Sequence, residues 1–266
     1  MILDFFSLII FGVDMNTTLK NVISKVPEVT LLFWVIKIVA TTLGETGGDA
    51  LSMSMELGYL LSSVIFAVIF AIAVFAQIKA KAFSPTLYWT TIIATTTLGT
   101  TIADFATRSI GIGYAGGSTL LFMLLIASLV IWYRSIGTIA VESINTPKAE
   151  MFYWVTIMFS QTLGTALGDW VADTPGLGYL GAAMVFGGLL LLIIAIYFWT
   201  EISRTILFWS AFVLTRPLGA VVGDYLDKPI DAGGLALSRF SASAVLLGFI
   251  IFCVIYFPQR AAQKSH

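Results

Sequence analysis

The chain has 266 residues, of which 58% are hydrophobic and 11% charged, and its mean hydropathy of +0.96 lies outside the range of soluble globular domains. Its net charge of −1 gives no basic surface for nucleic acid, and its single Cys and single His exclude an internal disulfide and a metal centre built from several thiolates or imidazoles. We therefore expect an integral membrane protein whose main partner is the lipid bilayer, with no nucleic-acid partner.

The N-terminal region is apolar as far as Val13, but it is too short for a membrane span and lacks the basic start of a signal peptide. Met15 precedes a polar stretch and is an alternative start codon, in which case residues 1–14 lie before the true start. We assign residues 1–27 to a cytoplasmic N-terminal segment.

Membrane spans are the next feature along the chain. A helix needs about 20 mostly apolar residues to cross a bilayer core of about 30 Å. Eight stretches meet this requirement, at about 28–51, 57–78, 85–108, 113–134, 148–172, 177–199, 204–226 and 233–257. The predicted fold class is therefore all-α integral membrane, with eight transmembrane helices. The chain is expected to divide into a first half (28–134), a cytoplasmic linker (135–147), a second half (148–257) and a cytoplasmic tail (258–266).

An internal repeat organises these spans. A Trp is followed by a Leu-Gly pair whose Gly lies ten residues on, and by an Asp five residues beyond that Gly. The four copies cover residues 34–49, 89–104, 154–169 and 209–224. Successive Trp residues are 55, 65 and 55 residues apart, which predicts two pseudo-symmetric halves of two repeats each. Each repeat is expected to be a hairpin of one patterned helix and one plainer apolar helix.

Basic residues predict the orientation. Nine Lys and Arg residues lie in loops on the side of the termini, against three on the other side, Arg108, Lys228 and Arg239. The positive-inside rule then places both termini in the cytoplasm, which fits a bacterial inner membrane. Because each repeat has two spans, all four repeats enter the membrane in the same direction, as parallel repeats.

Small residues form a first stripe on the patterned helices. Counted from each Trp as zero, positions +10 and +14 are occupied by Gly44 and Gly48, Gly99 and Ala103, Gly164 and Gly168, and Gly219 and Gly223. Small residues four apart let two helix backbones approach closely in lipid. We interpret them as helix-packing positions.

Polar residues form a second stripe on a neighbouring face, at positions +7, +11 and +15. It consists of Thr41, Glu45 and Asp49; Thr96, Thr100 and Asp104; Gln161, Thr165 and Asp169; and Arg216, Ala220 and Asp224. If the small-residue stripes bring the four helices together, the polar residues line a shared interior, where the four Asp carboxylates converge at one depth. We predict an ion pathway along this stripe.

The charges of this pathway predict the kind of ion. Five carboxylates face only two basic residues on the same helices, Lys37 and Arg216, and buried carboxylates must bind a cation, take up protons or pair with bases. The candidate ligands for a bound cation are Glu45, Asp49, Asp104, Asp169 and Asp224. Arg216 is a candidate tethered counter-charge for the empty site, and Lys37 is expected to extend toward the cytoplasmic surface. No other cofactor is expected.

Two alternatives remain open for these residues. Position +15 lies about 12 Å above +7, so the Asp residues can instead sit in water at the outer end of their helices. The repeated Trp residues are interpreted as interface anchors, with substrate stacking as the alternative. They are Trp34, Trp89, Trp154 and Trp209.

The four tandem two-helix repeats resemble a family of bacterial membrane-anchored proteins known by its fourfold repeat of unknown function. The resemblance covers about residues 31–256 and implies a multi-pass inner-membrane protein, but no activity. The fourth repeat departs most, with Arg216-Pro217 where the other repeats have Thr or Gln followed by Thr.

The leading functional hypothesis is a secondary transporter of a hard cation (Mn²⁺, Mg²⁺, Na⁺ or H⁺), with the two halves rocking around the polar stripe. Its candidate ligands are all oxygen atoms, which hard ions prefer. A non-transporting membrane scaffold and a transporter of a small organic metabolite are the alternatives. An enzyme is not expected, because the chain has no HExxH or GxSxG motif and no His or Cys placed as a nucleophile. Substrate, transport direction and oligomeric state are left open.

Overall fold

The structure, a computed structural model, describes residues 24–173 and 176–263. The expectations for residues 1–14 and for a start at Met15 lie outside this range. The described residues form eight α-helices and no β-strand, with short π- and 3₁₀-helical turns between them. The helices are α2 (Leu31–Asp49), α3 (Gly58–Lys79), α4 (Pro85–Asp104), α5 (Gly113–Ile136), α6 (Pro147–Asp173), α7 (Gly178–Trp199), α8 (Arg204–Asp227) and α9 (Arg239–Tyr256).

Local sequence accounts for the helix boundaries. Thr30 caps α2, and Pro85 and Pro147 start their helices where a missing N–H costs nothing. The predicted bounds agree with the structure within four residues, except that α9 begins at Arg239 rather than at 233. A 3₁₀ turn (Ile230–Ala232) and an irregular stretch precede it.

The Asp of each of the first two repeats is followed directly by a π-helical turn, Ala50–Ser54 after α2 and Phe105–Ser109 after α4. In the second half, α6 and α8 continue as α-helix for several residues beyond their Asp. The two halves therefore differ in backbone at the level of the Asp residues. Such π-turns are frequently found at functional sites.

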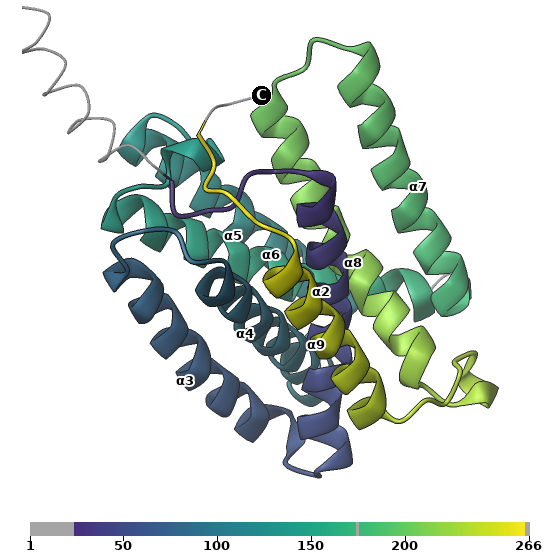
Figure 1. The fold of residues 1–266 in the computed structure, drawn as a ribbon. Coiled ribbons are helices and arrows are strands. Elements are labelled where there is room, and N and C mark those ends of the chain that lie inside the picture. Colours follow the sequence, from purple (N-terminus) through teal and green to yellow (C-terminus); the bar gives the residue numbers. More distant parts are fainter. Residues whose placement is uncertain (1–23, 174–175, 264–266) are drawn as a thin grey trace, which may run out of the picture.

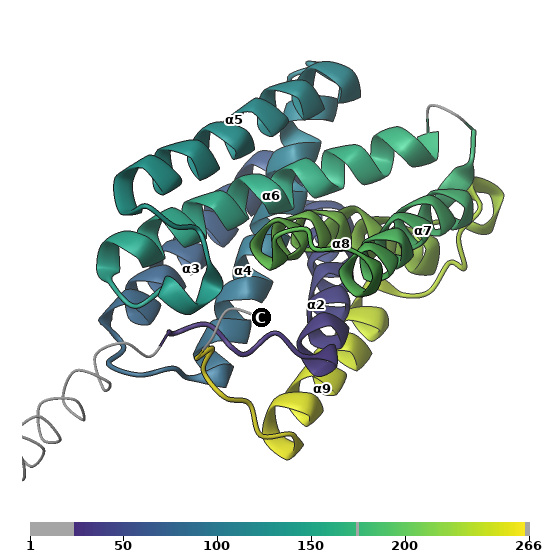
Figure 2. The same ribbon diagram turned by 90° about the horizontal axis from the view of Figure 1, so that it is seen from above.

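The four patterned helices form a closed ring. Helix α2 packs against α4 and α8, and α6 packs against the same two helices from the opposite side (Figures 1 and 2). The glycine at +10 of each helix lies against the +7 residue of the next one. The pairs are Gly44 with Thr96, Gly99 with Gln161, Gly164 with Arg216, and Gly219 with Thr41. Because the same positions meet at all four seams, the inner helices run parallel at a common register.

The seams have no room for a larger residue. A Cβ on Gly99 would lie 2.9 Å from the Cβ of Gln161, and one on Gly223 would lie 2.6 Å from the Cβ of Glu45. The small-residue stripe and the polar stripe lie on neighbouring faces of each helix and are thus the two sides of one seam. At every seam the +7 residue packs against the glycine of the neighbouring helix, and its side chain is buried in the ring.

The second helix of each repeat does not pair mainly with the first helix of its own repeat. Helix α3 packs along α4, α5 along α6, α7 along α8, and α9 returns to pack along α2 (Figure 2). The prediction of four self-contained hairpins is therefore wrong, because each outer helix crosses to the inner helix of the next repeat. The repeats interlock around the ring.

Inner and outer helices differ in their exposure. Six of the described helices are long and apolar enough to cross a membrane: α2 with its π-turn, α3, α5, α7, α8 and α9. The inner helices α2 and α8 each have 61% of their membrane-span residues buried. In the four outer helices the buried share is 11–28%. Helices α4 and α6 do not meet the criterion. Both are inner helices, and their polar residues are covered by the rest of the ring.

Aromatic side chains close the end of the ring where the inner helices begin. The residue before each Trp is also aromatic, and its ring contacts both its own Trp and the Trp of the next repeat, at centroid distances of 5.1–6.1 Å. These eight residues, the aromatic ring, are Phe33 and Trp34, Tyr88 and Trp89, Tyr153 and Trp154, and Phe208 and Trp209. Trp89, Trp154 and Trp209 are 1–4% exposed and pack inside the protein, which does not fit their interpretation as interface anchors, whereas Trp34 is half-buried.

The indole N–H groups bond to segments that cover this end of the molecule. Trp89 donates to Gln259 Oε1 at 2.8 Å, and Trp209 donates to the carbonyl of Ile139 at 3.0 Å. The chain before α2 pairs with the C-terminal tail through an isolated bridge between Pro27 and Ala261. Both ends of the described chain and the linker between the halves thus lie over the aromatic ring.

Candidate functional site

The polar stripe residues lie in the interior of the ring, and none is more than 3% exposed. We call positions +7, +11 and +15 of the four inner helices the polar core. The four Asp residues are included in this burial, so in the structure they are not in water at the helix ends. The glycines and Ala103 of the other stripe line the seams around the core.

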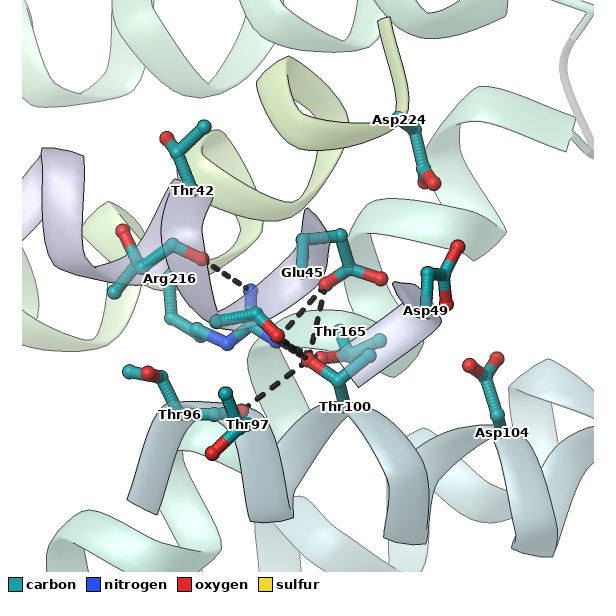
Figure 3. Close-up of polar contacts among 12 residues, drawn as sticks. Thr42, Glu45, Asp49, Thr96, Thr97, Thr100, Asp104, Thr165, Arg216 and Asp224 are labelled. Carbon is teal, nitrogen blue, oxygen red and sulfur yellow. Dashed lines mark hydrogen bonds and ion pairs between the residues drawn. The ribbon is translucent and has the colours of Figure 1, made fainter. Parts of the chain in front are cut away.

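Arg216 occupies the middle of the polar core (Figure 3). Its Nη2 donates to Glu45 Oε2 at 2.9 Å, to Thr100 Oγ1 at 2.6 Å and to Thr165 Oγ1. These three acceptors are the +11 residues of the other three repeats. The fourth +11 residue, Ala220, lies on the helix of Arg216 and carries no polar atom. The sequence predicts Arg216 as a counter-charge for the core, and in the structure its guanidinium forms an ion pair with the Glu45 carboxylate.

The four Asp residues form two pairs, each held by one basic residue, and not a single ring. Asp104 and Asp169 bind Arg108, at 2.9 Å from Nε and 3.0 Å from Nη2 respectively. We call this group the α4/α6 clamp.

On the opposite side of the ring, Asp49 and Asp224 bind Lys228 Nζ at 2.5 and 2.9 Å. Arg239 lies 3.9 Å from Asp49 and binds Asp227 at 2.6 Å. We call Asp49, Asp224 and Lys228 the α2/α8 clamp.

Basic residues outside the repeated pattern neutralise the carboxylates that the sequence left without a counter-charge. Arg108, Lys228 and Arg239 lie in or beside the connections at the Asp end of the helices, outside the repeated pattern. Arg108 and Lys228 each lie four residues after an Asp, and their side chains reach back over one helical turn. Extending the stripe from +15 to +19 would have identified both. The deficit of three positive charges is therefore wrong as a description of the folded protein.

Neighbouring carboxylates favour the charged form of Lys228. Burial by itself lowers the pKa of Lys228, but the carboxylates of Asp224 and Asp49 raise it above its ordinary value. An ammonium ion therefore lies between two buried carboxylates at the end of α8.

The ion pairs are placed according to the two halves. Among the described residues, each ion pair that joins two inner helices or their terminal turns crosses a seam between the halves, either α4/α6 or α2/α8. The seam inside the first half is joined instead by the hydroxyl of Thr100, which donates to the carbonyl of Gly44 at 3.1 Å. The ion pairs between inner helices are therefore confined to the two seams that join the halves.

One part of the core resembles a metal site. Glu45, Asp49 and Asp224 each offer a carboxylate oxygen, and these three oxygens lie within 4.8 Å of one another (Figure 3). Asp104 and Asp169, the other predicted ligands, do not belong to this group. We call Glu45, Asp49 and Asp224 the carboxylate triad.

Other polar residues do not join these groups. Gln161 is buried, and its side-chain amide has no hydrogen-bond partner among the described residues. Lys37 is also fully buried, with Nζ 4.2 Å from the centroid of the Phe212 ring, so the expectation that it reaches the cytoplasmic surface is wrong. Thr96 bonds to the carbonyls of Ile93 and Ala40 and helps to join α4 to α2.

A comparison with family models matches the chain in four consecutive segments, residues 32–83, 87–138, 152–203 and 207–261. The chain belongs to the Repeat of Unknown Function (DUF347) family. The predicted fourfold repeat is confirmed. No curated protein and no solved structure matches the chain.

Each DUF347 repeat begins two residues before its Trp, so it contains both members of the aromatic pair. The residue before the Trp does not stand out in the sequence, because it is Phe in the first and fourth repeats and Tyr in the second and third, in a chain already rich in both. Each DUF347 repeat therefore contributes two residues to the aromatic ring, one glycine seam and one Asp.

Proposed function

We propose that this DUF347 protein is a multi-pass transporter of a hard cation in the bacterial inner membrane, with both termini in the cytoplasm. The observation that carries the proposal is the polar core itself. It encloses five carboxylates and several hydroxyl groups within a ring of helices whose outer surface is apolar. Oxygen ligands of this kind suit Mn²⁺, Mg²⁺ or Na⁺.

Energetics favour a functional core over a purely structural one. Buried ion pairs lose much of their Coulombic attraction to desolvation, and apolar residues of similar volume often stabilise a protein as well or better. Intramembrane ionisable residues therefore mark ion pathways more often than helix packing. The glycine seams already provide close helix packing in this fold without them.

The placement of the ion pairs supports a movement of the two halves. The ion pairs between inner helices lie at the α4/α6 and α2/α8 seams, and the aromatic ring closes the other end. We propose that the halves rock about the aromatic end and that the two clamps act as the gate at the Asp end. Opening then requires Asp49 and Asp169 to exchange their basic partners for water or a cation.

A membrane scaffold is the second candidate, and the closed, interlocked packing of the ring favours it. A scaffold has the same ion pairs but carries no ion. It predicts that loss of a carboxylate changes stability alone.

Reconstituted vesicles distinguish these proposals. We expect the purified protein in proteoliposomes to carry Mn²⁺, and we expect Asp49→Asn and Asp224→Asn to reduce the initial rate by at least about tenfold. Asp231→Asn is the matched control, because Asp231 is exposed in the turn before α9. Flux that is unchanged in both core variants would overturn the cation pathway. Absence of flux from the wild type, for Mn²⁺ and the other hard cations, would favour the scaffold.

A further inference from the structure

We propose that the carboxylate triad (Glu45, Asp49 and Asp224) is a divalent-cation site, and that the Lys228 ammonium is a tethered competitor that occupies it until the cation binds. This inference specifies the substrate site of the proposed transporter and therefore rests on the proposed function. It assigns Lys228 a role in setting cation affinity.

The geometry of the triad suits a divalent ion. Three carboxylate oxygens within 4.8 Å of one another can reach a common centre, since hard divalent cations bind oxygen at about 2.0–2.6 Å. Figure 3 shows the side chains of Glu45, Asp49 and Asp224 gathered on one side of the core. They come from the two inner helices that meet at the α2/α8 seam.

A second observation points to a ligand beyond the amine. The Asp49 side chain is 1% exposed, and while Oδ2 binds Lys228, Oδ1 has no hydrogen-bond partner among the described residues. A buried carboxylate oxygen without a donor is costly. A cation between the carboxylates would use this oxygen.

The charges also match a divalent ion. With Lys228 withdrawn, the triad carries three negative charges and is in contact with one positive charge, Arg216, which lies 2.9 Å from Glu45. The remaining formal charge of −2 equals that neutralised by one divalent cation. Arg239 lies farther from Asp49, at 3.9 Å, and is bound to Asp227.

Lys228 is placed so that it can leave. It follows the last residue of α8, and its side chain is 11% exposed, whereas those of Asp49 and Asp224 are 1% and 2% exposed. The lysine side chain has a flexible stem of four carbons, so rotation about its bonds can move the ammonium to water without movement of α8.

The α4/α6 clamp provides an internal control. Arg108 also bridges two Asp residues, but the +11 residues near it are Thr100 and Thr165, so this clamp has no third carboxylate. Its planar guanidinium contacts each Asp through a different nitrogen. Removing Arg108 therefore removes the same charge from a site with fewer ligands.

Manganese binding to the solubilised full-length protein tests the proposal. The free Mn²⁺ concentration is followed by electron paramagnetic resonance in wild type, Lys228→Gln and Arg108→Gln. We expect Lys228→Gln to bind Mn²⁺ about tenfold more tightly than wild type or better, because the competing charged hydrogen bond is gone. Arg108→Gln should stay within about twofold of wild type. Equal affinities in wild type and Lys228→Gln, or tighter binding only in Arg108→Gln, would overturn the proposal.

A second measurement needs no variant. Reductive methylation of the wild-type protein, read by mass spectrometry, should modify Lys228 several-fold faster at saturating Mn²⁺ than without it, because the displaced amine enters water. Unchanged or slower modification would contradict displacement. Binding with the expected pattern but no flux in proteoliposomes would reject the transporter and retain the site. Flux without an effect of Lys228→Gln on Mn²⁺ binding would retain the transporter and reject the proposed role of Lys228 at the site.

Discussion

The two ends of the inner-helix ring are closed by different physical means. At the aromatic end, eight rings contact one another in a cyclic order that repeats at every seam, and three of the four Trp residues are at most 4% exposed. At the Asp end, two clamps hold only the seams between the halves. Apolar packing is strong and cannot exchange partners with water at low cost, whereas an ion pair can. The comparison indicates that the aromatic end maintains the fold and the Asp end changes during function.

The largest expected effect tests the aromatic end. Trp154→Ala removes a buried indole that contacts Tyr88 and Tyr153, and should lower the free energy of unfolding by about 3–5 kcal/mol. Unfolding in detergent micelles, followed by circular dichroism, measures it. The matched control is Trp199→Ala at the end of α7, where the side chain is 83% exposed. Equal losses of unfolding free energy in the two variants would contradict a stabilising role for the aromatic ring.

A smaller effect is expected at the Asp end. Arg108→Gln leaves Asp104 and Asp169 buried without a cation, but Arg108 is 35% exposed, so water replaces part of the interaction. We expect a loss of about 2 kcal/mol in the same assay. Adding Asp104→Asn should recover part of this loss, because one unpaired charge is removed. A double variant less stable than Arg108→Gln would show that the clamp does not act through charge.

The smallest effect concerns a single hydrogen bond. The hydroxyl groups of Tyr88 and Tyr153 lie 2.6 Å apart across the α4/α6 seam, and both side chains are fully buried. Tyr88→Phe leaves the Tyr153 hydroxyl without this partner and should cost about 1 kcal/mol. Tyr133→Phe, at a residue that is 58% exposed, should be neutral. A neutral Tyr88→Phe would mean that packing alone joins this end.

The sequence predicts the helices and the core well, because both depend on local periodicity. Small residues at +10 and +14 and polar residues at +7, +11 and +15 share neighbouring helix faces, so their burial follows once the four helices pack together. The Thr residues at +8, which are Thr42, Thr97 and Thr162, each donate to the carbonyl four residues earlier, a local bond that Thr commonly makes in membrane helices.

What sequence alone does not predict depends on contacts between repeats. Identical repeats can form hairpins or can exchange their outer helices around a ring, and the same apolar surface is buried in both cases. Lys228 and Arg108 follow their helices in sequence, yet long side chains place their charges one turn back in the core. A residue's position in a connection therefore does not fix where its charge lies.

The most direct test of the central claim is a structure of the wild-type protein in lipid nanodiscs with Mn²⁺, determined by electron cryomicroscopy. We predict a density peak about 2.0–2.6 Å from carboxylate oxygens of Glu45, Asp49 and Asp224, with Lys228 Nζ withdrawn from both Asp residues. At saturating Mn²⁺, a structure with Lys228 still between Asp49 and Asp224 and no peak at the triad would contradict the account.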